Sequence, residues 1–158
     1  MESHLLGAYS YAASASINFL QTGILQAGAW NYLREEITVA LIQRRGVRMG
    51  GIFDGQIESH LEGILPSDMI SYLLGKIINF SFTNTRQKSL EERLDYWASL
   101  RSALEDWNRR LAPDYSPFSN AVVRGNPFPS VWMLQPCHSK CTFSNNVYQT
   151  ILLTDRSQ

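Results

Sequence analysis

Apolar residues between positions 24 and 45 recur at the spacing of an α-helix. Successive members are three, four, three and one residues apart, which places them on one stripe of a helix with about 3.6 residues per turn. The stripe consists of Trp30, Leu33, Ile37, Ala40 and Leu41. The charged residues Arg34 and Glu35 fall largely off it. The pattern therefore predicts an amphipathic helix over residues 24–45, the clearest in the chain.

Two further helices are predicted on either side of this segment. The first 20 residues favour a helix with a face of small residues, broken at residues 21–23. Glycines at four positions between 46 and 55 indicate a loop that continues to about residue 62. A strongly apolar helix is expected after Pro66, with Ser67 or Asp68 as its N-cap. Its apolar character indicates a central place in the core.

Ser89 and Glu92 have the spacing of a capping box, which predicts the start of a fourth helix. A leucine or tryptophan recurs every seven residues along this helix, with further apolar residues beside the repeat. Together they are Leu90, Leu94, Trp97, Leu100, Leu104, Trp107 and Leu111. A seven-residue repeat can form a coiled-coil seam, but three repeats in a compact chain favour an ordinary core face. Pro113 is expected to end the helix.

Residues 112–136 contain five of the six prolines and several aromatic residues, which predicts an extended connector held against the core by its rings. A last helix is expected over residues 144–154. No segment alternates convincingly enough to predict a strand. The sequence therefore predicts one all-α domain over residues 1–158, an irregular helical domain of about five helices with a connector rich in proline and aromatic residues.

Composition supports a folded core and argues against direct DNA binding. Hydrophobic residues make up 44% of the chain and charged residues 18%, and the formal net charge is zero. A domain that binds DNA by itself normally has a basic face, because neutralising phosphates supplies much of the affinity. The one local excess of positive charge is at Arg44, Arg45 and Arg48, which we interpret as a solvated helix end. We expect no direct DNA binding by this chain.

The sequence offers little support for a metal site or a membrane segment. Cys137, His138 and Cys141 supply three ligand types within five residues, but structural zinc needs four ligands, usually from two separated pairs. We expect reduced thiols and no metal. Residues 5–20 resemble a secretory signal in being apolar, but they lack a basic start and are interrupted by polar residues. No run reaches the length needed to cross a bilayer, so we expect an intracellular chain without membrane contact.

No catalytic or cofactor-binding motif is found. The glycines of the string RMGGIFDG lack the following Lys-Ser/Thr of a phosphate-binding loop. Asp54, Glu58, His60 and Glu62 lie in one loop, but nothing fixes their relative geometry, so we interpret them as a solvated loop. The sequence therefore predicts no catalytic residue, no cofactor and no enzyme.

Five blocks of sequence resemble, in order, the fungal-specific transcription factor domain that follows zinc-cluster DNA-binding modules. The string AGAWNYLREEITVALIQRRGVRM is similar to the family's signature helix, and HLLGAYSYA is similar to the helix before it. DMISYLLGKIINFSF, LDYWASLRSALEDWNRRLAPDYSPF and NPFPSVWMLQPCHSKCTFSNNVYQTILLT resemble the blocks that follow. The resemblance assigns structural roles to Trp30, Leu33, Arg34, Glu35, Glu36, Ile37, Ala40, Leu41, Trp97, Trp107, Phe128, Pro129 and Trp132.

Within the signature, we expect Arg34, Glu35 and Glu36 to form a polar ladder at the edge of the core. The residues one turn from Arg34 are not acidic, so its partner should lie outside its own helix.

The resemblance implies a transcription regulator in the nucleus that controls a metabolic or secondary-metabolite gene cluster. The family's six-cysteine zinc cluster is missing, and its helical region usually continues beyond the last block, so we expect a truncated regulatory region. Protein partners in transcription, self-association and a small-molecule effector are all compatible with this class. The alternative is a stand-alone accessory protein or small enzyme of such a cluster that binds an apolar metabolite.

Overall fold

The computed structural model describes residues 2–14, 17, 23–50, 52–53, 57, 63–83, 89–111, 113–115, 119–121 and 130–132. Within them the chain is mostly helical, which confirms the predicted all-α class. The described residues contain four α-helices: α1 (Glu2–Ser14), α2 (Ile24–Gln43), α3 (Pro66–Phe82) and α4 (Leu90–Arg110). The first helix ends earlier than predicted. The helix predicted over residues 144–154 lies outside the described residues, as do most of the predicted connector and its prolines.

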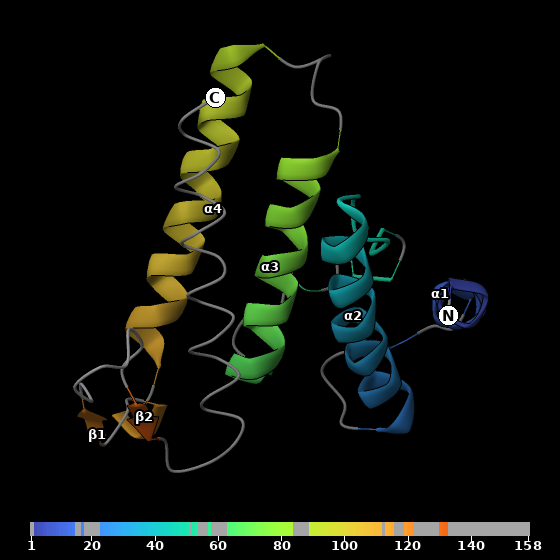
Figure 1. The fold of residues 1–158 in the computed structure, drawn as a ribbon, viewed down its shortest axis with the longest axis horizontal. Helices are drawn as coiled ribbons and strands as arrows, with labels where there is room; N and C mark the ends of the chain where they lie inside the picture. The colour runs from blue at the N-terminus through green and yellow to red at the C-terminus, as the bar shows by residue number, and fades with distance from the viewer. Residues whose placement is uncertain are drawn as a thin grey trace.

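The helices α2, α3 and α4 lie side by side, with α3 in the middle, and α1 lies next to α2 (Figure 1). Each helix therefore packs against its neighbour in the sequence. The central place predicted for α3 is confirmed, and the physical reason is its composition. Its buried residues include Ile70, Ile77 and Ile78, and the helix contacts both α2 and α4. A helix with apolar residues on most of its surface is stable only when it is covered on more than one side.

The α2 stripe is buried as predicted. Trp30, Leu33, Ile37 and Ala40 belong to the core, and Leu41 is half-buried against it. The loop after α2 also contributes to the core, which the sequence did not indicate. Its buried residues are Val47, Met49, Ile52, Phe53 and Ile57. This glycine-rich segment therefore covers one side of the α2–α3 layer instead of lying wholly in solvent.

The helix ends have identifiable causes. Arg44 ends α2 in a left-handed conformation with φ 52°, and the N–H of Arg45 then donates to the Ala40 carbonyl at 3.0 Å. The capping box of Ser89 and Glu92 is confirmed at the start of α4. The predicted N-cap of α3 was wrong. Pro66 is the first helical residue, because its fixed φ and missing N–H suit that position, and Leu65 is the N-cap.

The core face of α4 is confirmed only for its second half. Leu100, Leu104 and Trp107 are buried, and Trp97 and Leu111 are half-buried against the core. Leu90 and Leu94, in the first turns, are 70% and 57% exposed among the described residues. The repeat continues through the whole helix, but the N-terminal end of α4 extends beyond the end of α3 (Figure 1).

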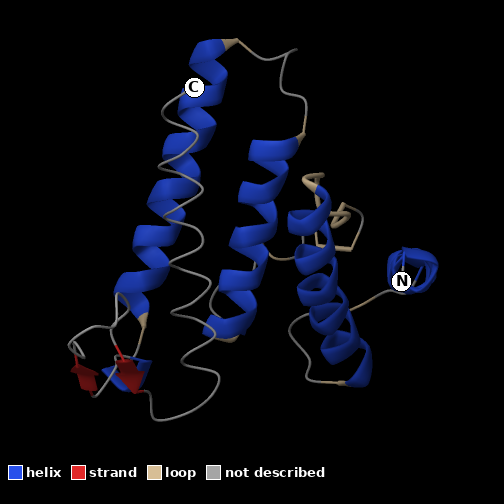
Figure 2. Cartoon of the chain, viewed as in Figure 1, coloured by secondary structure: helices blue, strands red, loops and turns tan. Residues whose placement is uncertain are grey.

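Two short strands that the sequence did not predict, β1 (Ser119–Ala121) and β2 (Ser130–Trp132), lie near the C-terminal end of α4 (Figure 2). They pair antiparallel, with Ser119 opposite Trp132 and Ala121 opposite Ser130. Both strands lie in the segment that the prolines predict to be extended, which is the backbone conformation that an antiparallel ladder requires. Over the described residues, no helix combines the length and apolar character needed to span a bilayer.

Candidate functional site

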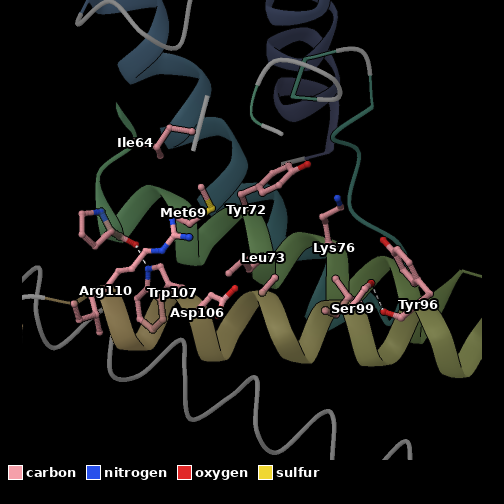
Figure 3. Close-up of a pocket in the computed structure, with 14 residues that line it drawn as sticks. Ile64, Met69, Tyr72, Leu73, Lys76, Tyr96, Ser99, Asp106, Trp107 and Arg110 are labelled. Atoms are coloured by element: carbon pink, nitrogen blue, oxygen red, sulfur yellow. Dashed lines mark hydrogen bonds between the residues drawn. The ribbon is translucent and has the colours of Figure 1, made fainter. Parts of the chain in front are cut away.

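A groove of about 800 Å³ lies between α3 and α4 (Figure 3). Its walls are mainly apolar and aromatic, and they come from both helices and from the turn before α3. The side chains that line it are Ile64, Pro66, Met69, Tyr72, Leu73, Lys76, Tyr96, Ser99, Leu100, Ala103, Asp106, Trp107, Arg110 and Leu111. An apolar concavity of this size with a few polar groups at its rim is the usual form of a small-molecule site.

Several aromatic walls of the groove are held in place by other contacts. The Trp107 Nε1–H donates to the Pro66 carbonyl at 3.0 Å, which links the end of α4 to the start of α3. The Tyr96 ring packs against Phe80, with centroids 5.8 Å apart. Because these rings already have partners, the groove is largely formed before any ligand binds.

Three of the described residues that line the groove are charged. Lys76 Nζ is 5.1 Å from the centre of the Tyr72 ring, and Arg110 lies toward the opposite end, beside Trp107 (Figure 3). Asp106 is ion-paired with Arg109 on its own helix. Within the described part of the lining there is no histidine or cysteine. The arrangement suits binding of an apolar molecule with a polar end.

A second cluster of charged groups lies at the end of α2, around a carboxylate that is fully buried. Glu36 has 0% side-chain exposure, and Arg45 binds it through two hydrogen bonds of 2.6 and 3.2 Å. The Arg48 side chain and its backbone N–H each donate to Glu36 Oε1 at 3.1 Å. Two arginines therefore neutralise one carboxylate and hold the loop after α2 against the helix.

This cluster corrects two sequence interpretations. Glu36 lies inside the core and not at its edge, and Arg45 and Arg48 are half-buried partners of it and not a solvated helix end. Arg44 alone of the three arginines is exposed. The reason is the left-handed turn at Arg44, which reverses the chain. Arg45 and Arg48, nine and twelve positions after Glu36, are thereby brought back to its carboxylate.

The polar groups around the cluster connect α2 to its neighbours. Arg34 forms an ion pair with Asp68 in the first turn of α3, which confirms that its partner lies outside its own helix. The Tyr32 hydroxyl donates to the Arg48 carbonyl at 2.8 Å. Burial and the nearby Glu36 carboxylate raise the pKa of Tyr32, so it stays protonated and keeps this bond.

The two buried carboxylates have pKa values shifted in opposite directions. Burial raises the pKa of Glu36, but the hydrogen bonds from Arg45 and Arg48 outweigh it, so the pKa lies below its ordinary value of 4.5. Burial raises the pKa of Asp68 above its ordinary value of 3.8, and the Arg34 ion pair offsets this only in part.

These directions predict how stability depends on pH. The contribution of Glu36 to the free energy of unfolding is complete at a pH above the pKa that the residue has in the unfolded chain. It is lost as the pH falls through the lower pKa of the folded state. The contribution of Asp68 to the free energy of unfolding is present at a pH below the pKa that the residue has in the unfolded chain. It is lost as the pH rises through the higher pKa of the folded state. In urea unfolding between about pH 3 and 7, Glu36→Gln should lose less stability on acidification than the wild type, and Asp68→Asn should lose more. An unchanged acid dependence in Glu36→Gln would contradict the assignment.

The residues assigned by the resemblance are distributed over several environments. Trp30, Leu33, Glu36, Ile37, Ala40 and Trp107 are buried, whereas Arg34, Leu41 and Trp97 are half-buried and Glu35 is exposed. Trp132 lies in β2. Phe128 and Pro129 lie outside the described residues. Among those that the structure describes, only Trp107 lines the groove.

Sequence reasoning missed most of the groove. Tyr72, Lys76, Ala103 and Arg110 lie within the quoted blocks, but the sequence assigned them no role, and they meet only because α3 and α4 pack together. The Cys-His-Cys string and the acidic loop residues singled out above lie outside the described residues. Over the described part of the chain, no group of three or more His, Cys, Asp and Glu side chains could hold a metal ion.

Comparison with protein-family models, with curated proteins and with solved structures gave no match.

Proposed function

We propose that the chain is the regulatory and interaction module of a fungal zinc-cluster-type transcription factor, acting in the nucleus on a metabolic or secondary-metabolite gene cluster. The observation that carries the proposal is the order of the five sequence blocks, which together extend over nearly the whole chain. Each block is weakly specific, but five in the same order are difficult to obtain by chance.

The geometry of α2 supports a structural role for the signature helix. Its buried carboxylate, Glu36, is used to hold the following loop, and Arg34 is used to hold α3. Both groups are thereby engaged in connecting elements of the fold. A module of this kind acts by binding, and the exposed Leu90 and Leu94 on α4 offer apolar surface to a protein partner or a second copy.

Deleting the gene in the organism that encodes the chain tests this proposal. We expect transcripts of one gene cluster to change several-fold, and re-expression of the full chain to restore them. The Glu35→Ala variant, altered at an exposed position, should restore them equally, whereas Glu36→Ala should not. Unchanged transcripts throughout would contradict the proposal. Tight, salt-sensitive binding of the purified chain to DNA would contradict the expectation that it binds no DNA by itself.

The groove between α3 and α4 supports one alternative. A stand-alone accessory protein or small enzyme of such a cluster would need a cavity for an apolar metabolite, and about 800 Å³ is sufficient for one. In that case, deletion should leave the cluster transcripts normal and cause an intermediate to accumulate. Loss of the cluster transcripts after deletion would instead favour the transcription regulator.

A further inference from the structure

We propose that the groove between α3 and α4 binds a small molecule with a flat apolar body and a carboxylate, and that Arg110 binds the carboxylate. The inference names the chemical class of the ligand. It holds whether the ligand is the effector of a regulator or the cargo of an accessory protein, because it concerns binding alone.

The walls of the groove favour a flat apolar body. Three of its lining side chains are aromatic, Tyr72, Tyr96 and Trp107, and Leu73 and Leu100 come from the facing helices. Aromatic rings offer large apolar area and prefer offset or edge contacts with other rings. The Tyr96 ring packs against Phe80 and the Trp107 indole donates to the Pro66 carbonyl, so little side-chain freedom is lost when a ligand enters.

The charges of the groove favour an anionic group. The described residues of its lining include two cations and one carboxylate, and that carboxylate, Asp106, is already paired with Arg109. In the described part of the chain, no carboxylate forms an ion pair with Arg110. The dipole of α4 accounts for a cation in its last turn, but it does not require that the side chain line the groove, as that of Arg110 does.

Arginine is suited to this role because its guanidinium presents two parallel N–H donors that match both oxygens of a carboxylate. Lys76, near the opposite end and against Tyr72, adds positive charge to the same cavity (Figure 3). An apolar molecule with its carboxylate at Arg110 would fill the space between the two cations.

The charge requirement is tested with a matched pair of probes, 2-naphthoate and the neutral 2-naphthamide, titrated into the purified full chain by calorimetry. We expect naphthoate to bind about tenfold more tightly than naphthamide. Arg110→Gln should remove this preference by weakening naphthoate alone. Arg101→Gln removes the same charge from an exposed position on α4 outside the groove and should leave both affinities unchanged.

The place of binding is tested with two serines on α4. Ser99 lines the groove and Ser102 does not, and both are exposed. Ser99→Trp should abolish binding of both probes, and Ser102→Trp should leave it intact. Equal effects of the two tryptophans, or equal affinities for the two probes, would overturn the proposal. It would also be overturned if neither probe bound and Ser99→Trp lowered the melting temperature, because the chain itself would then occupy the groove. These measurements use no transcript readout, so their failure is distinct from failure of the proposed function.

Discussion

Replacing Glu36 with alanine should lower the free energy of unfolding by about 3–5 kcal/mol. The side chain is fully buried, and three of its four hydrogen bonds come from the side chains of Arg45 and Arg48. Truncation leaves these two half-buried arginines without a counter-charge and also leaves the Arg48 N–H without its acceptor. Small domains are stable by only about 5–15 kcal/mol, so this single change removes a large share of the total.

Urea unfolding of Glu36→Ala measures this loss, and Glu35→Ala provides the matched control. Glu35 is the adjacent residue on α2, and it is exposed. Its replacement should change the free energy of unfolding by less than about 0.5 kcal/mol. Arg45→Met in the Glu36→Met background tests the mechanism, because removing both charges should cost less than removing the carboxylate alone. Similar losses for Glu36→Ala and Glu35→Ala would show that the buried cluster contributes little.

Replacing Phe53 with alanine should cost about 3–5 kcal/mol, which is the usual range for a buried phenylalanine. Phe53 is 0% exposed, although it belongs to the glycine-rich loop after α2. Its ring contacts Trp30 of α2, with centroids 5.1 Å apart, and Tyr72 of α3, with centroids 6.4 Å apart. The truncation removes apolar contacts to two helices and leaves a cavity between them.

Thermal unfolding is a direct measurement of the Phe53→Ala effect. In a domain of this size, each kcal/mol shifts the melting temperature by about 2–4 °C, so we expect a decrease of about 6–20 °C. Phe82→Ala, at the 36% exposed end of α3, is the matched control and should shift it much less. Equal shifts for the two phenylalanines would mean that the loop does not contribute to the core as its burial indicates.

Local patterns in the sequence were sufficient to predict the helices in which they occur. The stripe on α2 and the apolar surface of α3 report burial directly, because residues three and four apart share a face of a helix. The capping box of Ser89 and Glu92 is a contact between near neighbours, so its sequence spacing specifies its geometry. Local spacing did not specify the first residue of α3, because Pro66, Ser67 and Asp68 are all acceptable near a helix start.

Most of the candidate site could not be predicted from local sequence patterns. The signature indicated that Arg34 needs a partner outside its helix, and Asp68 is that partner, but no local rule identifies it across 34 positions. Likewise, the seven-residue repeat on α4 could not reveal that Leu90 and Leu94 would be exposed. The repeat specifies a face of the helix, whereas exposure depends on how far the neighbouring helix extends beside it.

The amino-acid sequence by itself determined that this chain forms amphipathic and apolar helices, because backbone propensity and side-chain periodicity are local. Tertiary structure alone decided that Glu36 is buried between Arg45 and Arg48, and that Tyr72, Ala103 and Arg110 line one groove. In both arrangements, the residues that meet are not separated by the three or four positions that place side chains on one face of a helix. These arrangements exist because the chain reverses at Arg44 and because α3 and α4 pack against each other.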